Sequence, residues 1–302
     1  MNYFLIKLEF DTQVHFGPSD TAQSLSVSED HFCADTIFSA LCHTALQCSG
    51  ISALEQLRGW VQKGERLISD SMPSREDDYF LPKPFVLSED RKELSASLKK
   101  TMKKLAWIPV RSFPAFMESV HGGTPFDPSK SAEAFGFQAE VTRAAVRDGM
   151  DAVPYLVGIY RFEENCGLYV IAAVKTAEQE TALLSLFQTL GMGGIGGKIS
   201  SGYGKFHLKD TVQLNEVYGN QTGWLYSALS KKTGLSLLLS TSLPKESELE
   251  LALENATFQV VRRGGFVASD TYAETPRKKK TQFFLRAGSM LSYRFEGDLY
   301  SV

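Results

Sequence analysis

Histidine and cysteine are scarce in this chain of 302 residues, which holds five histidines and four cysteines. The cysteines form no C-x-x-C pair, and no two histidines have the spacing H-x-x-x-H. Structural zinc sites and zinc enzymes usually show such spacings. The sequence therefore predicts buried, reduced thiols, no metal site and no cofactor.

Long apolar runs are also missing. No window approaches the ~20 consecutive apolar residues that a membrane-spanning helix needs. The N-terminus, Met1-Asn-Tyr-Phe-Leu-Ile-Lys, lacks the basic start and the small-residue cleavage site of a signal peptide. We therefore expect a cytoplasmic protein without membrane contact. At 43% hydrophobic residues, the chain can bury a full core and is long enough for two domains.

The chain also lacks an excess of positive charge. The net charge is -3 and the pI is about 6.0, so the whole chain has no field that would attract nucleic acid from a distance. A polyanion would have to be held by local basic groups, which are Lys99-Lys100 with Lys103-Lys104, Arg143 with Arg147, Lys198 with Lys205, Arg262-Arg263, and Arg277 to Lys280. For the first and the last group, a solvated surface explains the charge at least as well.

What the chain does have is a glycine-rich stretch, residues 191–204, with seven glycines. Glycine accepts positive φ and has no Cβ, so such a loop can bring its amide groups close to a ligand. Phosphate is the ligand we expect, because cationic, hydroxyl and aromatic side chains are interleaved with the glycines: Lys198, Ser200, Ser201, Tyr203 and Lys205. A plain linker would not need them. Tyr203 fits stacking on a base and packing beneath the loop equally well.

Two nucleotide-binding motifs can be excluded for this stretch. Gly191 to Gly196 fits G-x-G-x-x-G, but that fingerprint needs a strand before it and a helix after it, and here a predicted helix comes first. A Walker A loop needs four residues between its glycines and Ser or Thr after its lysine. Gly193 and Gly197 are separated by three residues, and Ile199 follows Lys198.

Hydrophobic periodicity predicts the elements around this loop. We expect a half-buried strand over 3–10, a helix starting at Asp35 as N-cap, a hairpin of strands 155–162 and 168–174, a helix over 177–190 and a strand over 204–214. With residues 49–154 as an insertion, the order is β-α-β-β-α-β, which is the ferredoxin-like order that RNA-recognition modules share. The sequence thus predicts an α+β N-terminal domain over 1–215.

The insertion and the C-terminal part are less regular. Residues 108–152 mix proline, glycine, aromatic and charged residues, and we expect a protruding loop in which Arg143 and Arg147, four apart, share a helical face. Residues 216–302 predict a second, β-rich domain of similar type, with strands near 234–241, 257–263, 281–287 and 289–296 and a short helix near 245–254.

Three segments together resemble a known family: the strand that leads to His15-Phe-Gly, the helix in Phe32 to Leu41, and Gly194 to Phe206 with its glycines, lysines and serines. They are similar to the RAMP superfamily of CRISPR proteins, and in particular to the subunit that caps the 5′ handle of the crRNA in type III-A (Csm) effector complexes. The C-terminal pattern of Gly264 to Ser269, Arg277-Lys, Ala287 to Met290 and Phe295 to Gly297 is similar to that subunit as well. Family members continue past the position of Val302 with a further strand.

The resemblance implies tandem ferredoxin-like domains, a glycine loop that grips the handle phosphates, and a thumb-like projection from the inserted region, about 108–152. It implies contact with the large polymerase-like subunit and the backbone RAMP subunit of the complex, an indirect relation to target RNA, and no catalytic role. The residues expected to contact RNA are Gly193, Gly194, Gly196, Gly197, Lys198, Ser200, Ser201, Gly202, Tyr203, Lys205, Arg143, Arg147 and His15.

Two other functions stay open at this point. Some RAMP relatives cut CRISPR repeat RNA without metal, using a histidine as general acid and base, and His15 is the candidate here. A local role in a turn explains His15 better, because the sequence places no tyrosine or lysine partner beside it. A scaffold that binds only protein, with the glycine loop against a neighbouring subunit, is the third possibility.

Overall fold

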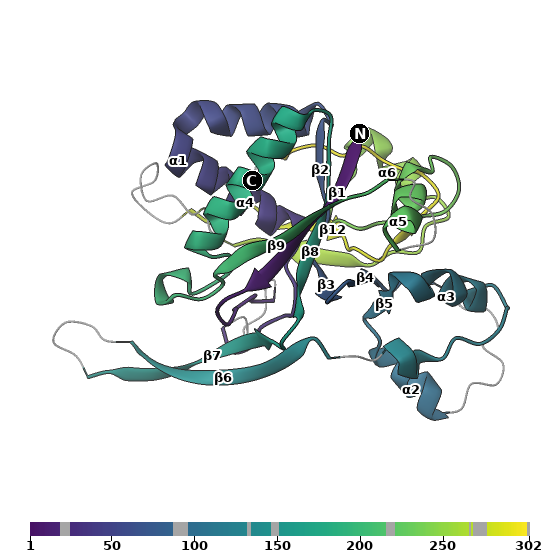
Figure 1. Cartoon of the computed structure of the whole chain (residues 1–302), viewed down its shortest axis with the longest axis horizontal. Coiled ribbons are helices and arrows are strands. Elements are labelled where there is room, and N and C mark those ends of the chain that lie inside the picture. The colour runs from purple at the N-terminus through teal and green to yellow at the C-terminus, as the bar shows by residue number, and fades with distance from the viewer. Residues whose placement is uncertain are drawn as a thin grey trace.

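The computed structural model describes residues 1–18, 25–86, 96–131, 134–145, 151–215, 221–265, 267 and 277–300. Its largest sheet is antiparallel and consists of β1 (Asn2–Phe10), β2 (Arg66–Ile68), β3 (Met72–Arg75), β4 (Asp78–Pro82), β5 (Trp107–Pro109), β8 (Cys166–Val174) and β9 (Phe206–Gln213). The strand order is β5-β4-β3-β8-β1-β9, and β2 pairs with β8 next to β3. β1 therefore lies between β8 and β9 in the middle of the molecule (Figure 1).

Two helices cover one face of this sheet. α1 (Ala34–Gln62) and α4 (Ala177–Gly193) lie across it (Figure 1), and their buried side chains pack against alternate residues of the central strands. This core contains Phe4, Ile6 and Leu8 of β1, Ile37, Leu41, Ala45 and Leu57 of α1, and Leu183, Phe187 and Leu190 of α4. The N-cap of α1 is Cys33 rather than the expected Asp35, which lies in the first turn.

The opposite face of the sheet is covered too, so β1 is buried on both sides and not on one side as its alternation predicts. Leu5, Tyr169 and Ile171 pack there against residues of α2 (Ala96–Lys104), α3 (Phe113–Val120) and α5 (Gln221–Ser230). Lys7 is only 5% exposed, and its ammonium group reaches the backbone oxygen of Glu76 at 2.9 Å and the carboxylate of Asp77 at 3.0 Å.

The projecting element is a long β-hairpin and not a loop. β6 (Gly136–Ala145) and β7 (Val153–Phe162) pair over their full length and extend away from the sheet (Figure 1). The hairpin is attached at its base, where Val14 and Tyr160 exchange backbone hydrogen bonds of 2.9 Å. The described residues before the hairpin, up to 131, include β5, α3 and short 3-10 turns. Aromatic side chains of this region fold back onto the protein; Phe135, for example, packs edge-on against Phe80.

Two sequence predictions about this region are wrong. Strands 155–162 and 168–174 do not form a hairpin with each other, since β7 pairs with β6 while β8 pairs with β1 on one side and with β2 and β3 on the other. Arg143 is not on a helix, because it lies in β6, and Arg147 lies outside the described residues. Apolar alternation marks a strand without identifying its partner, and this explains the first error.

The C-terminal part is built from two short strand pairs and a short helix. β10 (Ser236–Leu237) pairs with β13 (Met290–Leu291), β11 (Val260–Arg263) pairs with β12 (Gln282–Leu285), and α6 (Leu249–Leu253) follows a 3-10 turn. The buried carboxylate of Asp70 joins this part to the sheet, because it accepts hydrogen bonds of 2.7 Å from the backbone of Ala34 and from the backbone and hydroxyl of Thr241.

Among the described helices, α1 is long and apolar enough to cross a membrane by length and composition alone. Its backbone breaks at Gly50, where φ is 77°, and both halves contribute side chains to the core beneath it. We therefore interpret α1 as a core helix.

Candidate nucleic-acid interface

The glycine loop begins where α4 ends. Thr176 caps the start of α4 by accepting a hydrogen bond from the backbone of Gln179 at 3.2 Å. At the other end, Gly194 has a φ of 93° and donates its N–H to the carbonyl of Leu190 at 2.7 Å. Glycine adopts a positive φ without strain, so the loop can turn away from α4 directly after Gly193.

Backbone hydrogen bonds hold the loop against the segment that follows β1. Gly197 donates to the carbonyl of His15 at 2.8 Å, and Gly204 donates to the carbonyl of Gln13 at 3.0 Å. Within the loop, Ile195 donates to the carbonyl of Gly204 at 3.0 Å, and the N–H of Lys205 reaches the hydroxyl of Thr12, also at 3.0 Å. The loop is therefore a fixed part of the fold.

The glycines differ in how strictly the structure needs them. A Cβ on Gly196, whose φ is 99°, would come within 2.8 Å of the carbonyl oxygen of His15 and 2.9 Å of the ring of Phe16. A Cβ on Gly197 would come within 2.6 Å of the imidazole of His15. Gly202 has open space around it but a φ of 83°, and Gly193 has open space and no positive φ. Close approach of two chain segments thus explains Gly196 and Gly197, but not Gly193.

His15 lies beneath the loop and is 6% exposed. Its Nδ1 is 2.6 Å from the carbonyl oxygen of Gly158 in β7. A carbonyl oxygen can only accept, so Nδ1 carries the proton and donates it. The backbone carbonyl of His15 also accepts a hydrogen bond from the N–H of Gly197. His15 therefore links the loop to the base of the hairpin. The local structural role is therefore the one that the geometry supports.

Tyr203 is buried, with 3% of its surface exposed, and packs against Val157 and Ile159 of β7. Packing beneath the loop, one of its two predicted roles, is the one observed. Its hydroxyl accepts a hydrogen bond of 2.7 Å from the guanidinium of Arg143, which also lies 5.4 Å from the centre of the ring. Arg143 itself is exposed. The guanidinium is thus held at the surface by an aromatic ring.

Lys198 is also held by a tyrosine, in the way that Tyr203 holds Arg143. Its ammonium group lies 4.8 Å from the ring centre of Tyr155 and 3.4 Å from the hydroxyl of that residue. Tyr155 is the cross-strand partner of Arg143 in the hairpin, so the two cations and the two tyrosines form one group. We call Arg143, Tyr155, Lys198 and Tyr203 the cation–tyrosine cluster. Sequence analysis predicted three of its members but missed Tyr155, because nothing in the chain order brings position 155 to position 198.

The other predicted side chains lie on the outside of the loop. Ser200 and Ser201 form a 3-10 turn with Ile199, and both are exposed. In the part of the chain that the structure describes, their hydroxyls have no hydrogen-bond partner. Lys205 is exposed, and its side chain has no ion pair among those same residues. Two cations of the cluster, one further lysine and two hydroxyls therefore surround the loop.

The sequence predicts that the backbone amides of the loop face a ligand, but most of them are already used inside the protein. Those of Gly194, Ile195, Gly197, Gly202 and Gly204 donate within the protein. They hold the shape of the loop, so the side chains supply most of the groups that remain for a ligand. A phosphate backbone needs such groups, namely cations and hydroxyl donors. Within the described residues, no three His, Cys, Asp or Glu side chains lie together as a metal site requires.

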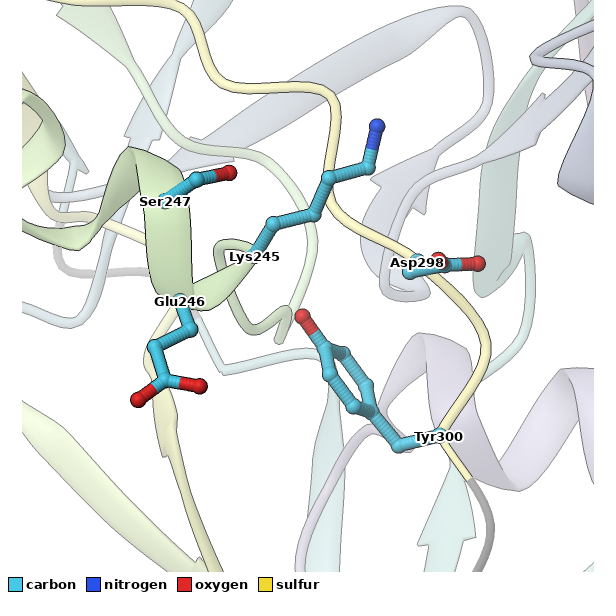
Figure 2. A pocket seen from close by; sticks show the side chains of 5 residues that line it. All are labelled: Lys245, Glu246, Ser247, Asp298 and Tyr300. Atoms are coloured by element: carbon cyan, nitrogen blue, oxygen red, sulfur yellow. The ribbon is translucent and has the colours of Figure 1, made fainter.

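A hollow lies in the C-terminal part, lined by Lys245, Glu246, Ser247, Asp298 and Tyr300, with a volume of about 650 Å³. Figure 2 shows that its charged side chains diverge: the carboxylates of Glu246 and Asp298 point away from each other. Lys245 pairs with Glu296 at 3.0 Å, and the hydroxyl of Tyr300 donates to the carbonyl of Pro244 at 2.6 Å. These contacts hold the last described segment in place, and no set of polar groups converges on a ligand.

Comparisons with known proteins support the resemblance noted above. A family model described as the CRISPR Csm4 C-terminal domain matches residues 231–302. The protein named CRISPR system Cms protein Csm4 of Mycobacterium tuberculosis (strain ATCC 25618 / H37Rv) is 35% identical over 307 residues, which is 100% of this chain and 92% of the relative. The protein of the same name from Streptococcus thermophilus is 28% identical over 308 residues, covering 100% of this chain and 93% of the relative.

Solved structures show the same fold. The crystal structure of a Csm3-Csm4 subcomplex in the type III-A CRISPR-Cas interference complex contains a similar chain, with a TM-score of 0.62, 15% identity and coverage of 99% of this chain and 94% of that one. A Csm1-Csm4 cassette in complex with AMPPNP contains another, with a TM-score of 0.58, 17% identity and coverage of 97% and 88%. With 35% identity to a named Csm4 over its whole length, the chain belongs to the Csm4 family of CRISPR proteins.

Proposed function

We propose that this protein is a non-catalytic, crRNA-binding subunit of a type III-A CRISPR interference complex, in which its glycine loop and cation–tyrosine cluster cap the 5′ handle of the guide RNA. The observation that carries the proposal is the surface at the base of the hairpin. There a loop held by backbone hydrogen bonds carries the exposed side chains of Ser200, Ser201 and Lys205. The guanidinium of Arg143 and the ammonium of Lys198 are held by the tyrosines of the cluster. Cations and hydroxyls are the groups that hold single-stranded RNA by its phosphates and sugars.

Membership of the Csm4 family supports the same role and gives the partners. The similar solved structures are complexes of Csm4 with Csm3 and with Csm1. By this likeness, the chain anchors the large polymerase-like subunit and contacts the backbone RAMP subunit, meets target RNA only through the assembled complex, and acts in the cytoplasm.

We further propose two ferredoxin-like domains, over 1–215 and 216–302. The strand order β9-β1-β8-β3, with antiparallel neighbours and α1 and α4 on one face, supports the first. The family model that matches residues 231–302 as a C-terminal domain supports the second. The insertion over 49–154 then contributes the hairpin, whose second strand runs on to Phe162 and which takes the place of the thumb-like projection.

The absence of catalysis is proposed from the surroundings of His15. A general acid and base must reach the proton that it moves, and it needs a second group that stabilises the charge on phosphate. His15 is 6% exposed, and its Nδ1–H is donated to the carbonyl of Gly158. His15 therefore orients the loop and does not face a scissile bond.

Purification tests the proposal directly. We expect the chain, co-expressed with the other complex subunits and a CRISPR array, to purify with RNA whose 5′ handle survives nuclease trimming. Co-expression without the array is the control. Material without RNA, containing all the protein subunits, would favour a protein-only scaffold. Cleavage of a repeat transcript by the isolated chain in EDTA, abolished by His15→Ala, would establish the endonuclease instead.

A further inference from the structure

The two faces of the β6–β7 hairpin differ in what they contact. In the register of the pair, alternate residues from Phe137 to Ala145 in β6 share a face with alternate residues from Val153 to Arg161 in β7. Tyr203 of the glycine loop packs against Val157 and Ile159 on this face. We call it the loop face, because the glycine loop lies against its middle.

Charge is divided between the two faces of the hairpin. The loop face holds Arg143 and Arg161 and no Asp or Glu, whereas the opposite face holds Glu140 and no Lys or Arg. The acid that follows β7, Glu163, lies 3.7 Å from the guanidinium of Arg75. The loop face is therefore the positive face of the hairpin, which suits an anionic partner.

Arg161 and Phe137 lie opposite each other at the base of the loop face. Arg161 is exposed, and its guanidinium has no ion pair or hydrogen bond within the described residues. Phe137 is 52% exposed, whereas Phe135, two positions earlier, is 4% exposed and packs against Phe80. An aromatic ring left in water beside a cation is an arrangement on which proteins stack the bases of single-stranded nucleic acid.

This pair and the cation–tyrosine cluster lie on either side of the glycine loop. Arg161 is two residues beyond Ile159, on which Tyr203 packs, and this is about 7 Å along the strand. In the other direction, Arg143 is six residues from Phe137, or about 20 Å. One nucleotide cannot reach both ends of this face. A ligand that uses both must be a strand of several nucleotides.

We propose that Phe137 and Arg161 form a second RNA-binding site at the base of the hairpin, in which a base of single-stranded RNA stacks on Phe137 and Arg161 binds the adjoining phosphate. The RNA is the strand that the glycine loop holds, and only its identity as the guide rests on the function proposed above. RNA suits this surface better than a protein does, because both charges of the loop face are positive and the loop beside it carries exposed hydroxyls and Lys205.

Fluorescence anisotropy of the full chain with a labelled RNA, the handle of the host CRISPR repeat, measures the two contributions separately. Phe137→Ser should weaken binding by about fivefold or more and leave its salt dependence unchanged, because stacking involves no charge. Phe137→Trp should restore the affinity, since tryptophan also stacks. Arg161→Ala should lower the slope of log affinity against log salt by about 0.7, the value for one phosphate contact on a single strand.

Leu156→Ser is the matched control, because Leu156 is 47% exposed on the opposite face of the same hairpin. It should change neither the affinity nor the slope. Wild-type affinity of Phe137→Ser, or an equal loss in Leu156→Ser, would overturn the inference. A Phe137→Ser variant that binds RNA normally but no longer assembles with the other complex subunits would overturn it too, and would make this surface a protein interface.

A second labelled RNA, a run of uridines of the same length as the handle, separates this inference from the function proposed above. If that function is wrong, Lys198→Ala with Lys205→Ala will weaken binding of neither RNA, while Phe137→Ser will still weaken binding of both. If this inference alone is wrong, the double lysine variant will weaken binding of the handle and Phe137→Ser will not.

Discussion

The glycines of the loop allow a graded test of the geometry, because an added Cβ meets a different environment at each. Gly193→Ala adds a methyl group into open space at a position without positive φ, so we expect a change in unfolding free energy of less than about 0.5 kcal/mol. Gly202→Ala also adds it into open space, but at a φ of 83°. An L-residue in this region costs about 1–2 kcal/mol.

Gly196→Ala should be the most damaging of the three. It combines a φ of 99° with overlap against the carbonyl of His15 at 2.8 Å and the ring of Phe16 at 2.9 Å. Overpacking of this kind costs about 1–3 kcal/mol, which adds to the backbone strain and gives about 2–5 kcal/mol. Urea unfolding followed by circular dichroism measures the series, and the handle affinity of the folded variants should fall in the same order. Equal stability of Gly193→Ala and Gly196→Ala would refute the reasoning.

The remaining predictions concern two ion pairs away from the loop. Burial opposes the charge of Asp30 and of His31, but their hydrogen bond of 2.7 Å outweighs it, lowering the pKa of Asp30 and raising that of His31. The pair should therefore stabilise the fold most between the ordinary values of 3.8 and 6.5, weakening as pH falls through the lowered pKa or rises through the raised one. His31→Asn should flatten this dependence in urea unfolding, whereas His121→Gln, at an exposed histidine, should not. Arg263→Ala removes two hydrogen bonds to Asp35 from a site where 18% of the arginine side chain is exposed, and should lower the unfolding free energy by about 1–3 kcal/mol. A change below about 0.5 kcal/mol would show that this contact does not hold β11 against α1.

The sequence predicts the central elements well because they have strong periods. β1, α4 and β9 lie where alternation or helical spacing puts them, and α4 ends at the first glycines of the loop. The strands around them follow weaker signals. β7 has the composition of a sheet strand, yet it pairs with β6, since the partner of a strand depends on contacts between distant segments that no local pattern contains.

The candidate site also contains residues that the sequence predicts and residues that only the structure reveals. Lys198, Lys205 and the two serines stand out in the sequence because charge and hydroxyls among glycines need an explanation, and the structure leaves the serines and Lys205 exposed. The role of Tyr155 was not predictable, because its ring meets Lys198 only after the hairpin folds back on the loop. The burial of His15 was also beyond the sequence, since it depends on Gly158 from another strand.

The most direct test of the central claim is the salt dependence of handle binding. A protein that loses two phosphate contacts on a single strand should lose about 1.4 from the slope of log affinity against log salt. We expect Lys198→Ala with Lys205→Ala to weaken binding of handle RNA and to lower the slope by this amount. Lys231→Ala with Lys232→Ala, a pair of exposed lysines after α5, should leave the slope unchanged. An unchanged slope in the Lys198 and Lys205 double variant, with its fold intact, would contradict the claim that this loop holds the guide RNA.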